Sequence, residues 1–133
     1  LRMKQHCANA EKVVSFLETQ KKVTNVIYPT NHQGEIKERA KKYLKGGNGA
    51  LVGADLGTAE AGAKFIDNLK MLYHVANIGD ARSLAIHPAT TTHSQLSEKE
   101  LLAAGVTPGY VRLSIGIEHP DDIIADIKQA LAA

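Results

Sequence analysis

The segment from Gly109 to Ile124 constrains the fold of this chain more than any other. Its first half alternates in hydrophobicity, with aliphatic residues at Val111, Leu113, Ile115 and Ile117 and other residues at Tyr110, Arg112, Ser114 and Gly116. A period of two predicts a β-strand over 110–117 with one apolar face. Pro120 suits the first position of a helix, and Asp121 and Asp122 would lie in its first turn, where the helix dipole favours carboxylates. The segment therefore predicts a strand that runs directly into a helix.

Arg112 is the unusual residue of this strand, because it interrupts a run that is otherwise suited to burial. A guanidinium group is a planar fork of N–H donors that matches a carboxylate or a phosphate. Charged side chains are, however, mostly exposed to solvent. Strand periodicity alone thus leaves two interpretations open, a solvated strand residue and a clamp for an anion.

The rest of the chain predicts a small α+β domain. Helical periodicity favours helices near 2–17, 35–44, 58–69, 97–104 and 120–131, and β-rich runs favour strands near 23–28, 49–55, 72–76 and 83–87. Thr58 has the position of an N-cap, and Ser97 and Glu100 have the spacing of a capping box. The short connection between 72–76 and 83–87 predicts that these two strands are antiparallel. We expect a small mixed or antiparallel sheet with helices on one face.

The opposite face of that sheet is predicted to be semi-polar and open. On one strand Arg112 and Ser114 oppose the aliphatic residues, and on another Ser83, Ala85 and His87 share a face. Such a face needs water or a partner against it.

Amide and hydroxyl side chains are expected beside this face. They come from the polar segment that starts at Asn77, which includes Asp80 and Ser83, and from Thr90 to Thr92. With Arg112, this set could bind a small anion.

Composition and motifs exclude several classes of function. The net charge of +2 with interleaved acids argues against a nucleic-acid surface. No apolar run approaches the roughly 20 residues of a membrane span. The single cysteine, Cys7, excludes an intrachain disulfide and suits a reducing cytoplasm. The histidines lack metal-ligand spacing, so no metal site is predicted, and no nucleophile stands with a base and an orienting group.

The chain begins at Leu1, within a helical pattern and without an initiator methionine. We therefore expect it to be the C-terminal piece of a longer protein. The alternative is a free-standing binding or assembly module without activity.

Two further segments carry a resemblance to a known family. They are S-L-x-x-H-P-A-x-x-T-H at 83–93 and V-R-L-S-x-G-x-E at 111–118. Together with Arg2–Ala10 and Val26–Pro29, they closely resemble the Cys/Met-metabolism family of pyridoxal-phosphate enzymes, and the resemblance spans essentially the whole chain. Within that family, Asn77–Leu84 and Thr90–Leu96 look most like O-acetylhomoserine sulfhydrylases, which make homocysteine or methionine from O-acetylhomoserine and sulfide or a thiol. Cystathionine γ-synthase and methionine or cystathionine γ-lyase remain alternatives.

The resemblance implies roles for five residues. Arg112 would hold the α-carboxylate of the amino-acid substrate, and Asn77 would make a second contact to it, largely through its backbone. Thr91 would lie near the γ-substituent of the substrate. Ser83 and His93 are carried over only as structural positions near the site.

The resemblance also implies what this chain does not contain. Residues 1–133 correspond to the C-terminal substrate-binding domain of a fold-type I enzyme, and the large domain that binds pyridoxal 5'-phosphate has no counterpart here. The Schiff-base lysine belongs to that large domain, so no catalytic residue is predicted in this chain, and the chain alone is expected to be inactive. Its expected partners are the small-molecule substrate, the large domain of the same protein and other copies in a cytoplasmic homotetramer.

Overall fold

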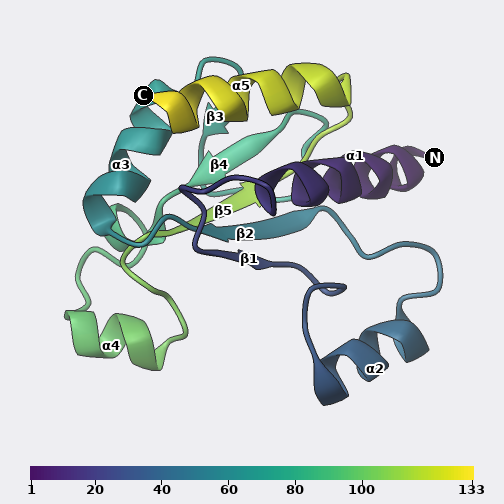
Figure 1. The fold of residues 1–133 in the computed structure, drawn as a ribbon, viewed down its shortest axis with the longest axis horizontal. Helices are drawn as coiled ribbons and strands as arrows, with labels where there is room; N and C mark the ends of the chain where they lie inside the picture. Colours follow the sequence, from purple (N-terminus) through teal and green to yellow (C-terminus); the bar gives the residue numbers. More distant parts are fainter.

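The computed structural model describes residues 1–133 and contains one five-stranded sheet with helices on both sides (Figure 1). The helices are α1 (Arg2–Leu17), α2 (Gly34–Tyr43), α3 (Ala59–Asn68), the short 3-10 helix η1 (Pro88–Thr90), α4 (Glu98–Ala103) and α5 (Pro120–Ala132). The strands are β1 (Asn25–Ile27), β2 (Leu51–Asp55), β3 (Tyr73–His74), β4 (Leu84–Ile86) and β5 (Tyr110–Ser114). No helix is both long enough and apolar enough to span a membrane.

The sheet is mixed, with the order β1-β2-β5-β4-β3. Strand β5 lies at its centre and pairs antiparallel with both β2 and β4, while β1 pairs antiparallel with β2. Strands β3 and β4 pair in parallel, so the predicted antiparallel pairing of these two strands is wrong. The expectation assumed that a parallel return requires a long crossover. Because β3 has only two residues, the chain advances only about 7 Å along it, and the loop 75–83 is long enough to return that distance without a helix.

Helices α1, α3 and α5 cover one face of the sheet and form the core with it (Figure 1). The helices contribute apolar side chains at helical spacing, and the sheet contributes every second residue of its strands. The buried sheet residues of this core are Val52, Ala54, Ala85, Val111, Leu113 and Ile115. The apolar half of the alternation in 110–117 therefore faces the helices as predicted up to Ile115, whereas Ile117 lies beyond the end of β5 and is exposed.

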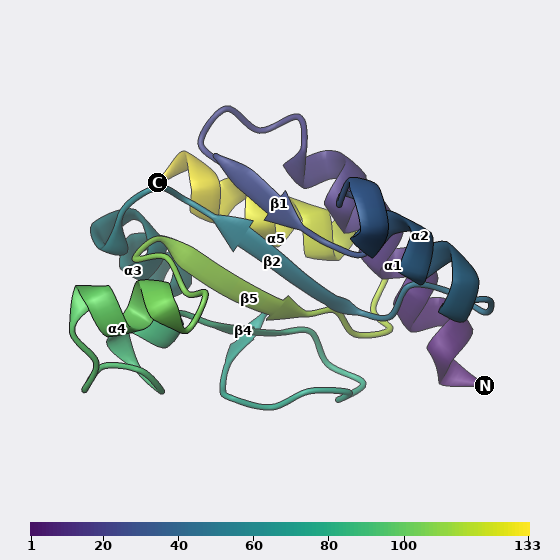
Figure 2. The same cartoon turned by 90° about the horizontal axis from the view of Figure 1, so that it is seen from below.

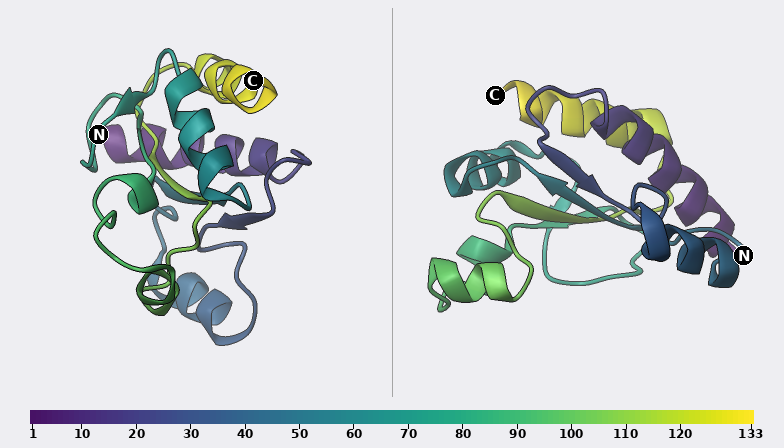
Figure 3. Two further views of the ribbon diagram at one scale, coloured as in Figure 1. Left: turned by 90° about the vertical axis from the view of Figure 1, so that its left-hand side faces the viewer. Right: turned by 60° about the horizontal axis from the view of Figure 1, so that its bottom comes forward.

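Helices α2 and α4 lie on the other side of the sheet (Figures 2 and 3). They flank the open face instead of covering it, and α2 buries none of its residues. The helical spacing of Ile36, Ala40 and Tyr43 predicts an inward-facing stripe, but Ile36 and Tyr43 are exposed. The α+β class with a small mixed sheet is confirmed, and the three helices that build the core share one face.

The orientation of β4 differs from the prediction. Ala85 pairs with Leu113 and joins the helix-covered core, so Ser83 and His87 are directed to that side and are fully buried. The ring of His87 would lie 2.6 Å from a Cβ atom on Gly62 in α3. The aliphatic residues Leu84 and Ile86 are the ones that share a face with Arg112. Alternation correctly predicted which residues of β4 share a face. It could not predict which face packs against the helices, because all three residues of β4 are apolar.

Helix α1 buries polar residues that its apolar periodicity did not predict. His6 and Asn9 are buried, whereas Met3, which helical spacing with Cys7 and Ala10 predicts to face inward, is exposed. Nδ1 of His6 lies 2.7 Å from the Ile115 carbonyl and donates to it, because a carbonyl oxygen can only accept. Nδ2 of Asn9 donates to the Gly116 carbonyl at 3.0 Å. These bonds satisfy the backbone where the chain leaves β5.

The local helix signals are confirmed. The Thr58 hydroxyl accepts from the Ala61 amide at 3.1 Å, Ser97 and Glu100 form a capping box, and Pro120 begins α5. These features depend on residues within one turn of each other, which is why the sequence sufficed.

Asp126 in α5 anchors the segment that precedes β3. Its buried carboxylate accepts backbone N–H bonds from Lys70, Met71 and Leu72 at 2.9, 2.8 and 3.0 Å. Burial by itself would raise the pKa of Asp126, but these donors and the Gln129 amide outweigh it and hold the pKa below its usual value.

We expect Asp126→Asn to lower the free energy of unfolding by about 2 kcal/mol at neutral pH, because the amide presents one acceptor atom instead of two. The pKa of Asp126 is lower in the folded state, so its contribution is complete above the unfolded pKa of about 4 and is lost as the pH falls through the folded pKa. Denaturant unfolding of the two proteins should therefore converge in acid. Asp67→Asn, at an exposed position of α3, is the control; a constant difference down to low pH would contradict this role.

Candidate substrate-binding face

Arg112 lies at the centre of the open face. The strand register places it in one row across the sheet with Ile27 of β1, Gly53 of β2 and Ile86 of β4. The side chain is half-buried, and its Nε atom is inaccessible and has no hydrogen-bond partner. A buried N–H donor without a partner costs free energy, so this edge of the guanidinium is suited to an acceptor that the chain does not supply.

Asn77 is the one residue that forms a hydrogen bond with the guanidinium. Nη2 of Arg112 donates to the Asn77 carbonyl oxygen at 3.2 Å. The Asn77 side chain turns away from Arg112, since its Oδ1 accepts from the Ile78 amide at 2.9 Å. The structure therefore brings together two of the residues that the resemblance singled out, and it does so through the backbone of Asn77.

A groove of about 490 Å³ adjoins Arg112, between the open face and α2. Its walls are mostly apolar and come from β1, α2, β2 and β5. The lining residues are Ile27, Tyr28, Pro29, His32, Ile36, Arg39, Ala40, Tyr43, Leu44, Leu51, Val52, Gly53, Tyr110 and Arg112. The only cationic side chains besides His32 are Arg39 and Arg112, and Arg39 is exposed and bonded to Glu35 at 2.6 Å. Arg112 is thus the available cation of the groove.

Tyr110 occupies the space beside Arg112 that Gly53 leaves free. A Cβ atom on Gly53 would lie 2.6 Å from Cε2 of Tyr110 and 3.0 Å from Cβ of Ile27. Burial raises the pKa of Tyr110, although the charge of Arg112 opposes that shift. The phenol therefore stays neutral at physiological pH and presents an O–H group next to the guanidinium. Strand alternation placed Tyr110 on the same face as Arg112. Only the pairing of β2 with β5 shows that the residue opposite Arg112 is a glycine, Gly53.

Thr91 and His93 lie in the turns after η1 and contact neither Arg112 nor Asn77. The Thr91 hydroxyl donates to the His87 carbonyl at 2.8 Å, and Nδ1 of His93 pairs with the Thr92 hydroxyl at 2.8 Å. Both side chains are half-buried. Their predicted places near a substrate stay predictions.

Ser83 lies on the helix-covered side, buried, at the end of the loop that carries Asn77. Its hydroxyl accepts from the Gly116 amide at 2.8 Å and donates to a carboxylate oxygen of Glu118 at 2.9 Å. It is therefore a structural residue behind the open face. Local sequence patterns did not predict the role of Glu118, because its partner Ser83 is 35 residues away.

The open face fits a carboxylate and does not fit pyridoxal phosphate. A site for that cofactor needs a lysine amine for its aldehyde and an acid for its ring nitrogen. No lysine and no acid lines the groove beside Arg112. A carboxylate, in contrast, would pair with the guanidinium of Arg112 and offset its charge. The chain also has no group of three or more His, Cys, Asp or Glu side chains that could hold a metal ion.

Comparison with known proteins identifies a matching family. The family described as Cys/Met metabolism PLP-dependent enzyme matches residues 1–132. The O-acetyl-L-homoserine sulfhydrylase of Leptospira meyeri is 50% identical over 133 residues, which are 98% of this chain and 30% of that protein. The L-methionine gamma-lyase of Fusobacterium nucleatum subsp. polymorphum is 45% identical over 132 residues, which are 98% of this chain and 33% of that protein. The chain thus spans about a third of the length of these relatives.

A solved structure shares the fold. It is a Campylobacter jejuni protein described as an O-acetylhomoserine (thiol)-lyase. Its TM-score to this chain is 0.91 and its sequence identity is 43%, and the match covers 99% of this chain and 32% of that one. That structure carries N'-pyridoxyl-lysine-5'-monophosphate at its position 205, outside the part that corresponds to this chain.

Proposed function

Because the chain belongs to the Cys/Met metabolism family of PLP-dependent enzymes, we propose that residues 1–133 are the C-terminal substrate-binding domain of an O-acetylhomoserine sulfhydrylase. The whole enzyme makes homocysteine or methionine from O-acetylhomoserine and sulfide or a thiol, a step of methionine biosynthesis. The observation that carries the proposal is the half-buried Arg112 in the open face, with its free Nε donor and the Asn77 carbonyl against its Nη2 atom.

In this proposal Arg112 binds the α-carboxylate of the amino-acid substrate by paired N–H donors. Asn77 contributes through its backbone, by fixing the guanidinium from the side of loop 75–83. Thr91 lies near the γ-substituent, and Ser83 and His93 support the site from outside it. Bound pyridoxal phosphate supplies the electron sink for the chemistry, and the part of the protein that binds it faces the open side of the sheet. The residues of this chain bind and orient the substrate.

A γ-lyase of the same family is the second candidate, because the methionine gamma-lyase of Fusobacterium nucleatum is nearly as similar as the sulfhydrylases. The two activities are separated by supplying the full-length enzyme with O-acetylhomoserine, with and without sulfide. A sulfhydrylase forms homocysteine only with sulfide. A lyase releases α-ketobutyrate from methionine or cystathionine without any acceptor. Release of α-ketobutyrate as the main product from all these substrates would overturn the proposal.

We expect the 133-residue chain alone to be inactive and to retain no stoichiometric pyridoxal phosphate, because no lysine lies in the groove of the open face. Equilibrium dialysis of the purified chain against the cofactor measures this. The full-length protein is the control that must retain cofactor after dialysis. Stoichiometric retention by the short chain would contradict the division of roles.

We propose further that the whole protein is a cytoplasmic homotetramer. Exposed apolar residues at the rim of the open face, among them Leu51, Tyr73 and Ile78, support an assembled state in which this face is covered. The single buried thiol of Cys7 is consistent with a reducing compartment. Light scattering of the full-length protein measures its oligomeric state.

A further inference from the structure

The turn between β5 and α5 holds the loop that carries Asn77. Glu118 in this turn places both carboxylate oxygens on one residue, Ser83, the last residue of that loop. Oε1 accepts from the Ser83 amide at 2.6 Å and Oε2 accepts from the Ser83 hydroxyl at 2.9 Å. Glu118 is half-buried and has no cationic partner, so its bonds to Ser83 are its main stabilising contacts. Hydrogen bonds to an ionised acceptor are the stronger kind.

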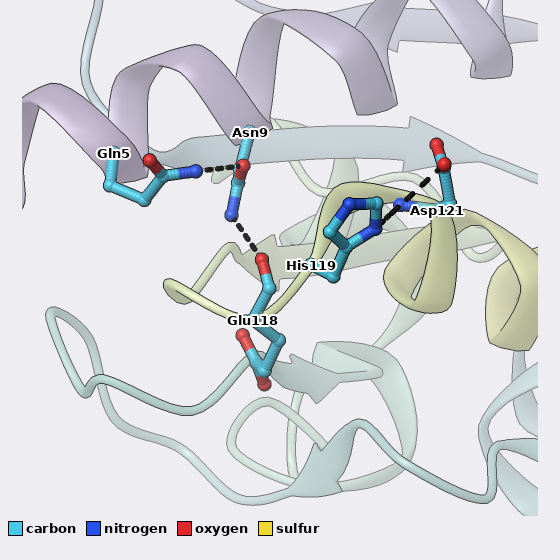
Figure 4. A network of polar contacts seen from close by, with 5 residues as sticks. All are labelled: Gln5, Asn9, Glu118, His119 and Asp121. Carbon is cyan, nitrogen blue, oxygen red and sulfur yellow. Dashed lines mark hydrogen bonds and ion pairs between the residues drawn. The ribbon is translucent and has the colours of Figure 1, made fainter.

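Neighbouring bonds tie the same two segments together. The Ile117 amide donates to the Ala81 carbonyl at 2.9 Å, and the Gly116 amide donates to the Ser83 hydroxyl at 2.8 Å. The turn itself is fixed from α1, since Nδ2 of Asn9 donates to the Glu118 carbonyl at 2.8 Å and Gln5 donates to Oδ1 of Asn9 at 2.7 Å (Figure 4). The turn is therefore a rigid base for the loop.

The outer part of the loop has few contacts of its own. Residues 75–79 are exposed, and three hydrogen bonds tie them to other segments. The Val75 amide donates to the Ala85 carbonyl at 3.2 Å, the Gly79 amide donates to the Ser114 hydroxyl at 3.3 Å, and the Asn77 carbonyl accepts from Arg112 at 3.2 Å. An exposed loop with few buried contacts takes its geometry from where its ends are held. At the end of the loop next to β4, the strongest interaction is that of Ser83 with the carboxylate of Glu118.

We propose that Glu118 is a positioning residue for the guanidinium of Arg112. It acts through Ser83 and the loop 75–83, which sets the Asn77 carbonyl against Nη2. Without the carboxylate the loop shifts, the Asn77 carbonyl leaves Arg112, and the guanidinium loses the orientation in which it receives a carboxylate. This inference rests on the substrate-binding role proposed for Arg112.

The test uses the full-length enzyme and Glu118→Ala, with Glu118→Gln as a graded variant that keeps the shape and loses the charge. We expect Glu118→Ala to raise KM for O-acetylhomoserine about tenfold with kcat within about threefold, because substrate orientation depends on the position of Arg112. The KM of Glu118→Gln should lie between that of the wild type and that of Glu118→Ala. Asp122→Asn, an exposed acid in the first turn of α5 with no side-chain partner, is the matched control and should match the wild type.

A double-mutant cycle separates positioning from general destabilisation. If Glu118 acts through Arg112, Glu118→Ala should raise KM by less than about twofold in an Arg112→Ala background. A full tenfold rise in that background, or no rise in either, would overturn the inference. Ser83→Ala, which removes one of the two bonds, replaces Glu118→Ala if that variant does not fold.

Amide hydrogen exchange of the full-length protein provides a readout that does not depend on activity. Amides of residues 76–82 should exchange about tenfold faster in Glu118→Ala than in Asp122→Asn, while those of α3 stay unchanged. Equal exchange rates for residues 76–82 in the two variants would show that Glu118 does not stabilise the loop. If the wild type lacks sulfhydrylase activity, the proposed function fails by itself, and the exchange result still decides the role of Glu118.

Discussion

Arg112→Ala in the full-length enzyme is expected to lower kcat/KM for O-acetylhomoserine by at least about 100-fold, or about 3 kcal/mol of transition-state stabilisation. The guanidinium is the available cation of the open face, and its Nε donor has no partner in the chain. Removing it takes away the group that receives the α-carboxylate and fixes the direction from which the substrate presents its γ-carbon. Much of the rate of a bound reaction depends on such orientation.

Two variants show whether the guanidinium itself is required. Arg112→Lys keeps the charge and loses the planar fork, so we expect it to recover less than about a tenth of the lost kcat/KM. Arg39→Ala removes the other arginine of the groove, which is exposed and bonded to Glu35, and should stay within about threefold of the wild type. A kcat/KM for Arg112→Ala within about threefold of the wild type would refute the carboxylate-binding role.

The largest loss of stability is expected for Gly116→Ala. A Cβ atom at this position would overlap the Ala81 carbonyl oxygen and a carboxylate oxygen of Glu118 and would lie 2.6 Å from the Arg82 carbonyl carbon. Two of these atoms are backbone atoms of the loop that Glu118 holds, so no side-chain rotation relieves the overlap. We expect the free energy of unfolding to fall by about 3 kcal/mol, at the upper end for overpacking.

Gly46→Ala is the matched control for this substitution. No atom lies within 4 Å of a Cβ at Gly46, and its backbone is outside the left-handed region. Its free energy of unfolding should stay within about 0.5 kcal/mol of the wild type. Denaturant unfolding followed by circular dichroism measures both, and equal stability of the two variants would show that the turn at Gly116 adapts without cost.

The features that the sequence predicted well depend on residues close together in the chain. The alternation from Val111 to Ile115 identified the central strand, and Pro120 marked the start of α5. The Ser97 capping box was readable because its partners are three residues apart. In each case the physical cause lies within one or two turns of chain, so the residues themselves contain the information.

The features that were missed depend on distant partners. His6 and Asn9 are buried because they bond to carbonyls more than 100 residues away, at Ile115 and Gly116. The role of Asp126 was not predicted, because the three amides that it accepts come from 70–72, more than 50 residues away in the chain. For Arg112, periodicity left open whether it was solvated or a clamp. Only the register of β2, β5 and β4 shows that it lies half-buried in a row of apolar neighbours.

Helix α2 gives the groove beside Arg112 two unlike walls. One wall is the sheet, whose far side is packed into the core by three helices. The other is a ten-residue helix that buries nothing and is supported by exposed pairs such as Arg39 with Glu35. A short helix without buried contacts has little stability of its own. The groove can therefore widen or narrow around what enters it by moving α2 alone, while the strand that holds Arg112 stays in place.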